Sequence, residues 1–129
     1  HDPFLLLREF ARLLRSGGML ILSTPNIHNL RSRLKFLLRG TLFWFDAREA
    51  TGIGHVNVVP YFILTHILDV AGFSDVCVRS NRAVQPAVPN WLARVMQSVL
   101  SQEAYGEREL NSPTFLNGEG LIVSARKSR

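Results

Sequence analysis

Residues 17–26 read Gly-Gly-Met-Leu-Ile-Leu-Ser-Thr-Pro-Asn. Four consecutive apolar residues, Met19 to Leu22, stand between paired glycines and a Thr-Pro-Asn turn. A short run that is apolar on both faces is typical of a strand covered on both sides. The stretch therefore predicts an interior strand of an α/β sheet, and the segments on either side of it predict helices.

The chain before this strand predicts the first helix. Asp2 can cap its N-terminus, and Pro3 suits the first helical position. Leucine and phenylalanine then recur at helical spacing over residues 6–14, with arginines on the opposite face. Gly17 and Gly18 are expected to end the helix, because glycine accepts the left-handed conformation found there.

The chain after the strand predicts a basic amphipathic helix. Asn26 can cap it, and Gly40 can end it. Its apolar stripe consists of Leu30, Leu34, Leu37 and Leu38. Arg31, Lys35 and Arg39 share another face at spacings of four residues. A solvated surface helix and a binding surface both explain this basic stripe.

The rest of the chain continues to alternate between helices and strands. Residues 41–60 are expected to form a long loop or lid with at most a short helical turn. The later elements are expected as a helix over 61–71, a strand over 75–80, a helix from Asn90, an irregular segment over 102–118 and a strand over 121–125. Cys77, in the second strand, is expected to be a buried and inert thiol. This alternation indicates a layered α/β fold.

Length, cysteine content and charge limit the classes of protein to which this chain can belong. The 129 residues suffice for one domain, and the single cysteine excludes an internal disulfide. No apolar run reaches the ~18 residues that span a bilayer, and a cytoplasmic location is expected. The net charge of +5 indicates either an anionic partner or acidic residues outside this chain. Nucleic acid is not expected as a partner, because the basic residues are scattered and the aromatic residues form one cluster.

Six stretches stand out along the chain: His1-Asp2-Pro3, residues 12–26, residues 29–34, His55, Ala71-Gly72-Phe73 and residues 120–127. Taken together, they resemble class I S-adenosylmethionine-dependent methyltransferases of the type 11 and type 23 groups. No single stretch is specific, so the order and spacing of the pieces carry the resemblance. It is weaker over residues 41–54 and 81–118.

The resemblance implies an α/β fold with a partial Rossmann-like methyltransferase sheet and flanking helices. The sheet would hold the last three strands of that fold, the final one antiparallel and inserted between the other two. Residues 1–129 would be a single partial domain, the C-terminal half of the fold, with 41–60 as a loop or lid insertion. The cofactor would be S-adenosylmethionine. The chain nevertheless has no Gly-x-Gly-x-Gly loop after a strand, so most of the cofactor site would lie outside it.

Candidate site residues follow from the resemblance and from the chemistry of methyl transfer. The resemblance places His1 near the cofactor. His55 suits a catalytic general base, because a neutral imidazole can accept a proton near neutral pH; a surface or structural histidine is the alternative. The histidines show no metal-ligand spacing with acidic residues, so no metal is expected.

Four further residues are candidates for binding the methyl acceptor. Thr24 and Asn26 follow the carboxyl end of a strand, where α/β sheets place ligand contacts. Asn26 as a helix cap is the alternative. Phe43 and Trp44 are adjacent aromatic residues that either face the acceptor or pack a lid onto the helices.

Two functions remain open at this point. The parent protein would transfer a methyl group to a small-molecule or lipid-like acceptor, this chain supplying mainly the acceptor side and being inactive alone. Alternatively, the chain is a non-catalytic remnant or interaction module that needs a partner segment to complete its sheet. We expect self-association, or pairing with an N-terminal half, through the exposed sheet edge. Peripheral membrane contact is a further open alternative.

Overall fold

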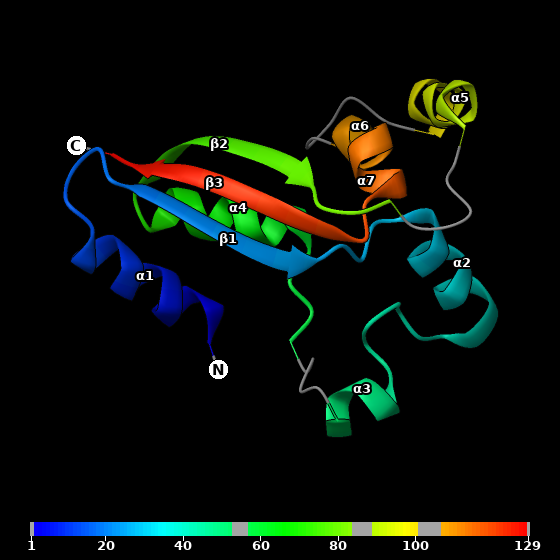
Figure 1. The fold of residues 1–129 in the computed structure, drawn as a ribbon, viewed down its shortest axis with the longest axis horizontal. Coiled ribbons are helices and arrows are strands. Elements are labelled where there is room, and N and C mark those ends of the chain that lie inside the picture. Colours follow the sequence, from blue (N-terminus) through cyan, green and yellow to red (C-terminus); the bar gives the residue numbers. More distant parts are fainter. Residues whose placement is uncertain (1, 53–56, 84–88, 101–106, 129) are drawn as a thin grey trace. The chain divides into compact units, whose positions relative to one another are not determined.

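The computed structural model describes residues 2–52, 57–83, 89–100 and 107–128. In this part of the chain, the strands are β1 (Met19–Pro25), β2 (Phe73–Ser80) and β3 (Gly120–Lys127). The helices are α1 (Pro3–Leu13), α2 (Leu30–Arg39), α3 (Ala47–Gly52), α4 (Tyr61–Val70), α5 (Asn90–Leu100), α6 (Glu107–Leu110) and α7 (Pro113–Asn117). Figure 1 shows the alternation of helices and strands that the sequence predicts.

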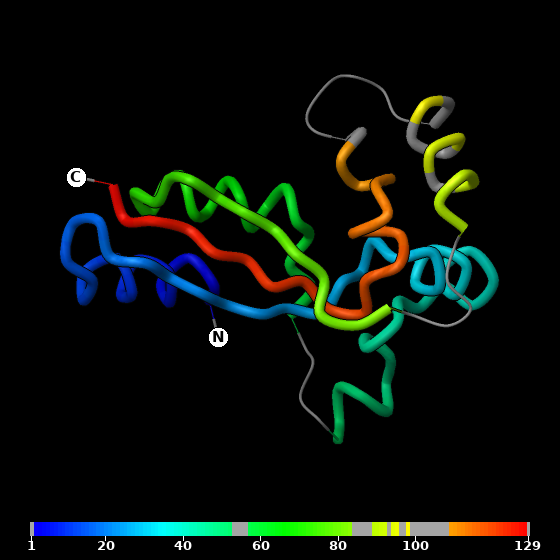
Figure 2. The backbone as a smooth tube through the Cα atoms, turned by 45° about the horizontal axis from the view of Figure 1, so that its top comes forward, coloured from blue at the N-terminus to red at the C-terminus, as the bar shows by residue number. Residues whose placement is uncertain are grey.

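The strands form one sheet in the order β1-β3-β2, which Figures 1 and 2 both show. The amide of Lys127, at the end of β3, donates to the carbonyl of Gly18, just before β1 (2.8 Å). The amide of Asn26, just after β1, donates to the carbonyl of Glu119, just before β3 (3.1 Å). This crossed pairing makes β3 antiparallel to β1, and the same pattern joins β3 to β2. The expected insertion of an antiparallel last strand between the other two is confirmed.

The chain divides into two compact units, and each is described by itself. The sheet unit comprises His1–Thr24, Val59–Arg79 and Ile122–Arg129. The helical unit comprises Pro25–Val58 and Ser80–Leu121. The sheet unit carries most of the three strands with α1 and α4, and the helical unit carries the other helices.

Helices α1 and α4 supply the apolar core of the sheet unit. The core residues of this unit are Leu7, Leu20, Leu64, Ile67, Leu68, Phe73, Val123 and Ala125. Three of them, Leu64, Ile67 and Leu68, lie on α4, and α4 lies behind the sheet in Figure 1. Apolar residues at helical spacing on α4 thus meet the alternate buried positions of β3.

Both predicted ends of α1 are found, although the C-terminal end differs in detail. The carboxylate of Asp2 accepts from the amide of Phe4 (2.8 Å), as an N-cap does. The helix ends at Leu13 rather than at the glycines, because the ammonium of Lys127 caps it by donating to the carbonyls of Ala11 and Leu14. Gly17, with φ at 76°, then makes the turn into β1.

The helical unit contains elements that the sequence did not predict. Helices α6 and α7 occupy part of the segment expected to be irregular, and Phe115 and Leu116 of α7 are fully buried. Leu30 of α2 and Leu92 of α5 pack against Leu116. Helix α3 is the short helix allowed within 41–60, and residues 53–56 of that range lie outside the described residues. The short helices were missed because four or five residues carry no helical periodicity.

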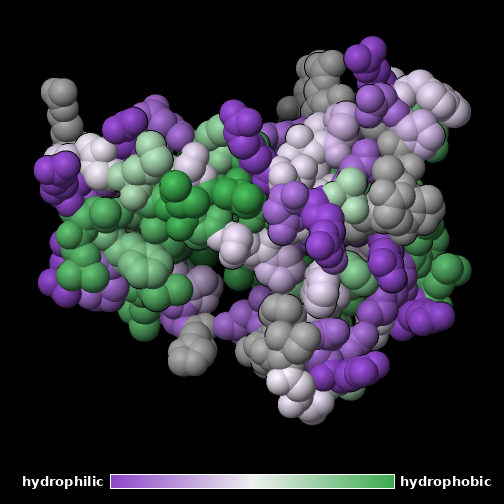
Figure 3. Space-filling view, in the orientation of Figure 1, coloured by the Kyte–Doolittle hydropathy of each residue, from purple (hydrophilic) through white to green (hydrophobic). Residues whose placement is uncertain are grey.

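Two burial expectations for the strands are wrong. Cys77 is exposed, not buried. In β1 only Leu20 is buried, whereas Met19 is 55% exposed and Ile21 is 65% exposed. The physical reason is the same for both strands: β1 and β2 are the outer strands, and α1 and α4 cover only one face of the sheet. Figure 3 shows hydrophobic residues gathered on the open face, over the sheet.

The outer edge of β1 leads us to expect that this chain associates with other copies of itself. An apolar strand with an unpaired edge is a template for another strand. We expect the chain alone to be dimeric or aggregated, and Ile21→Lys to shift it toward monomer, because a charge on an edge strand opposes further pairing. Light scattering of the two proteins over a concentration series measures this. A monomeric, cooperatively melting wild-type chain would contradict the expectation.

Candidate functional site

The helical unit places a buried polar cluster directly after β1. Asn26 is fully buried, and its side-chain amide donates to the carbonyls of Phe115 (2.7 Å) and Gly118 (2.8 Å). Its side-chain oxygen accepts from the amide of His28 (3.0 Å). Asn26 therefore ties the turn after β1 to the turn between α7 and β3. Both donors and one lone pair of this side chain are used in hydrogen bonds within the fold. We call this side chain a bracket, because it holds two turns together.

Asn29, and not Asn26, caps α2. Its side-chain oxygen accepts from the amide of Ser32 (2.7 Å), and its amide donates to the carbonyl of Asn26 (2.7 Å). The prediction that Asn26 caps this helix is wrong, because the helix begins three residues later than expected and the side chain of Asn26 is directed to α7. Gly40, with φ at 68°, ends the helix as predicted.

A chain of hydrogen bonds connects Asn26 to the aromatic pair of the following loop. Asn26 is bonded to Asn29, Asn29 to the amide of Ser32, and the hydroxyl of Ser32 accepts from the amide of Phe43 (3.0 Å). The rings of Phe43 and Trp44 have centroids 5.0 Å apart. Three of the predicted acceptor-side residues, Asn26, Phe43 and Trp44, thus belong to one connected arrangement.

The guanidinium of Arg33 is the second bracket of the cluster. Its Nε donates to the carbonyl of His28 (2.7 Å), and its two terminal nitrogens donate to the carbonyl of Leu110 and the side-chain oxygen of Asn111. Burial lowers the pKa of Arg33 from its ordinary value, because the charged form loses solvation. The planar fork of arginine therefore joins the start of α2 to the end of α6.

The imidazole of His28 lies in the same cluster, with its ring edge-on to Phe115 (centroids 6.0 Å apart). Burial, and secondarily the charge of Arg33, lowers the pKa of His28 to about 4. His28 is therefore neutral at physiological pH. Its ring partner, Phe115, comes from a segment far along the chain, on α7.

The depressed pKa of His28 predicts a pH dependence of stability. The unfolded state takes up the proton near its ordinary pKa of 6.5, whereas the folded state resists protonation down to about 4. The contribution of His28 to stability is therefore fully present above the unfolded pKa, and it decreases as the pH drops from 6.5 toward 4. Between about pH 7 and about pH 5 we expect the free energy of unfolding to decrease by about 2 kcal/mol through this residue.

Urea unfolding of wild type and His28→Gln at several pH values isolates this contribution from that of the carboxylates. The difference between the two proteins is expected to shrink as the pH falls. NMR titration of the imidazole measures the pKa directly. A His28 pKa near its ordinary value, or equal pH slopes for the two proteins, would show that the imidazole is not buried as described.

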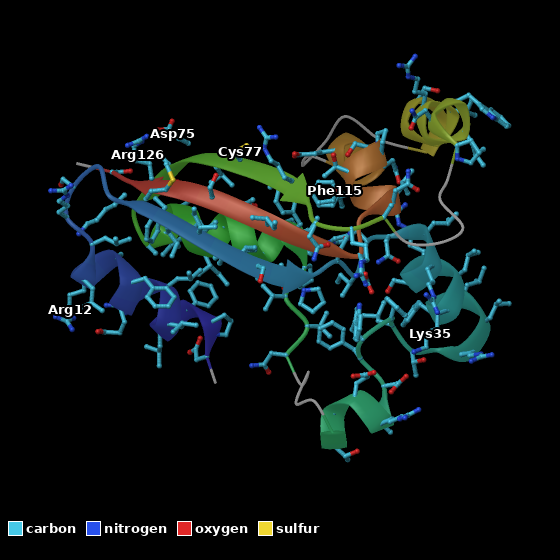
Figure 4. The ribbon with its side chains drawn as sticks, viewed as in Figure 1. Arg12, Lys35, Asp75, Cys77, Phe115 and Arg126 are labelled. Atoms are coloured by element: carbon cyan, nitrogen blue, oxygen red, sulfur yellow. The ribbon has the colours of Figure 1, made fainter. Side chains whose placement is uncertain are left out.

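The other side of α2 carries a groove of about 380 Å³. Its walls are formed by Arg31, Leu34, Lys35, Leu38, Arg39 and Phe43. The guanidinium carbon of Arg31 lies 4.3 Å from the centroid of the Phe43 ring, a cation–π geometry. The ammonium of Lys35 contacts the carboxylate of Asp46 (2.7 Å), and this hydrogen bond lowers the pKa of Asp46. Figure 4 marks Lys35 on α2.

The remaining predicted site residues are placed as follows. Thr24 is half-buried near the end of β1 and belongs to the sheet unit, whereas Asn26, Phe43 and Trp44 belong to the helical unit. His1 and His55 lie outside the described residues. Asn29, Ser32 and Arg33 were not singled out from the sequence. The Asn-x-x-Ser spacing of a helix cap could have found the first two, but nothing local identifies the partners of Arg33.

The described residues do not by themselves fit a binding site for S-adenosylmethionine. None of the described strands leads into a glycine-rich loop that opens a helix, and none is followed directly by a carboxylate. The asparagines that follow β1 and β2 are engaged instead: Asn26 as above, and Asn81 through its side-chain oxygen, which accepts from the amide of Gly120 (2.9 Å).

Two further properties concern metals and membranes. In residues 2–52, 57–83, 89–100 and 107–128, no group of three or more His, Cys, Asp or Glu residues lies together as metal ligands would. None of the helices in these ranges is long and apolar enough to cross a bilayer.

Comparison with known proteins supports the fold. No family model matches the sequence, and no curated protein matches it. The structure is similar to the crystal structure of a SAM-dependent methyltransferase from Archaeoglobus fulgidus, with a TM-score of 0.54 and 18% sequence identity. The alignment covers 98% of this chain and 54% of that chain, so the chain spans about half the length of this structural neighbour. The chain therefore has a methyltransferase-like α/β fold.

Proposed function

We propose that this chain is the C-terminal half of an S-adenosylmethionine-dependent methyltransferase of the type 11 or type 23 kind, and that it supplies mainly the acceptor side. The observation that carries the proposal is the β1-β3-β2 sheet with its reversed last strand. The structural neighbour supports it, because nearly the whole chain aligns with about half of a protein described as such an enzyme. The remaining half of the fold would hold the cofactor, and His1 is the residue of this chain proposed to contact it.

The acceptor is proposed to be a small-molecule or lipid-like compound. Thr24, Asn26, Phe43 and Trp44 are the proposed acceptor-side residues. Asn26 would act by positioning, since its side chain is fully buried and bonded. Trp44 has φ at 70°, a left-handed conformation that bulky residues rarely adopt and that is enriched at functional sites. His55 is proposed as the general base that removes a proton from the acceptor.

Transfer of radiolabelled methyl groups tests the proposal. The protein, together with the coding sequence that precedes residue 1, is incubated with labelled S-adenosylmethionine and with small-molecule and lipid extracts. Label is expected in an acceptor from one of the two extracts, and His55→Ala is expected to reduce it. No transfer to either extract, together with no binding of the cofactor product, would contradict the proposal.

A second candidate function rests on the open edge of β1. A non-catalytic module whose sheet is completed by a partner would also have β1 as an outer strand, as this chain does. The two candidates differ in their dependence on the preceding sequence. An enzyme half needs a covalently continuous cofactor half, whereas a module pairs with a separate chain and transfers no methyl group.

A further inference from the structure

The solvent-facing side of α2 exposes several large apolar side chains, which a helix that only contacts water would not be expected to carry there. Leu37 and Leu38 are each 78% exposed, and Leu34 is 48% exposed. On a helix, positions 34, 37 and 38 lie side by side, so these leucines form one continuous patch. Exposed apolar patches of this kind mark surfaces that another apolar phase covers.

Positive charge borders this patch. Arg31, Lys35 and Arg39 follow one another at spacings of four residues and line the same groove as Leu34 and Leu38. Residues 10–45 contain no Asp or Glu. Lys35 is paired with Asp46, but no described carboxylate pairs with Arg31 or Arg39. The groove therefore offers two unneutralised guanidinium groups beside a strip of leucines, and Figure 3 shows hydrophobic and hydrophilic residues adjacent where α2 lies.

We propose that α2, with Phe43 beside it, docks on the surface of an anionic lipid bilayer. The leucines would enter the boundary between headgroups and acyl chains, and Arg31 and Arg39 would bind lipid phosphates at that level. Charge complementarity, together with the leucines, favours an anionic bilayer as the partner. A nucleic acid would pair with the arginines but would leave three exposed leucines in water. Of the proposed acceptor-side residues only Phe43 borders this surface, and the leucines and arginines that would bind the bilayer have no part in the proposed methyl transfer.

Helix α1 provides a comparison within the same chain. It also exposes leucines, among them Leu5 (60%) and Leu13 (69%), and it also carries arginines. Its outer face differs because Glu9 lies among its arginines and pairs with Arg12 (2.9 Å), whereas α2 itself contains no acidic residue. We expect α1 to contribute little to binding of an anionic surface, which makes it the source of matched control substitutions.

Vesicle flotation with the purified protein tests the proposal. We expect binding to phosphatidylcholine vesicles that contain about one third phosphatidylglycerol, much weaker binding to pure phosphatidylcholine, and a loss of affinity as salt is raised. Arg39→Gln is expected to weaken binding roughly fivefold, and Arg8→Gln on α1 to change it little. Leu37→Gln with Leu38→Gln is expected to weaken binding roughly tenfold or more, compared with little change for Leu5→Gln with Leu13→Gln.

Three outcomes would overturn the proposal. They are absence of binding to anionic vesicles, equal losses from the α1 and α2 substitutions, and salt-sensitive binding to RNA or DNA through Arg39 without vesicle binding. Thermal melting of each variant confirms that the exposed substitutions leave the fold intact. Binding of S-adenosylhomocysteine by the N-terminally extended protein is measured in parallel, so failure of the membrane inference and failure of the methyltransferase proposal are told apart.

Discussion

Replacing Asn26 with alanine is expected to lower the free energy of unfolding by about 3 to 4 kcal/mol. The substitution removes two donors and one acceptor from a fully buried site. It leaves the carbonyls of Phe115 and Gly118 and the amide of His28 without this partner. Each buried polar group left unpaired costs about 1 to 3 kcal/mol, and partial relaxation of the turns recovers some of that cost. Urea unfolding followed by circular dichroism measures the change.

Asn81→Ala is the matched control for this substitution. Asn81 also bridges a strand end to β3, through one hydrogen bond to the amide of Gly120, but it is exposed. Its loss is expected to cost less than about 1 kcal/mol, because water replaces the lost partner. Equal and small effects of the two substitutions would mean that the buried bracket after β1 does not hold the two turns together.

The second large effect is expected from Arg33→Met, at about 3 kcal/mol of destabilisation. Methionine keeps much of the volume of the side-chain stem but donates no hydrogen bond. The carbonyls of His28 and Leu110 and the side chain of Asn111 then lose a charged partner. Charged donors contribute more than neutral ones, so the three bonds together outweigh the favourable loss of a partly desolvated charge.

Two measurements make the Arg33 prediction specific. Arg39→Met, at an exposed position of the same helix, is expected to change stability by less than about 0.5 kcal/mol. Arg33→Met is also expected to raise the pKa of His28, because it removes the nearby positive charge that helps to lower that pKa. If Arg33→Met still folds and the pKa of His28 does not change, then Arg33 does not lie close enough to His28 to affect it. That result would contradict the described cluster.

The sheet was predictable from the sequence because its decisive features are local. The apolar run Met19–Leu22, the segment around Phe73 and the last strand each carry their own pattern, and the resemblance supplied their order. The exposure of Cys77 and Ile21 was not predictable, because it depends on which sheet face the helices cover. An apolar strand with one covered face has the same sequence pattern as a strand covered on both faces.

The candidate site was predictable only in part. The sequence predicts Thr24, Asn26, Phe43 and Trp44 as acceptor-side residues. The link that joins the last three passes through Asn29 and Ser32, to which the sequence assigns no role. The partners of Asn26 lie about 90 residues away, at Phe115 and Gly118. Hydrogen bonds over such separations leave no periodic trace in a sequence, so the bracketing role of Asn26 emerges only from the structure.

Binding of S-adenosylhomocysteine, measured by isothermal titration calorimetry, tests the central proposal most directly. The titration is made against residues 1–129 alone and against the protein extended by its preceding coding sequence. We expect binding to the extended protein and none to residues 1–129, because the described strands lead into no glycine-rich loop and no carboxylate. Absence of binding to the extended protein, or equal binding to both, would contradict the proposal that this chain is the acceptor-side half of a methyltransferase.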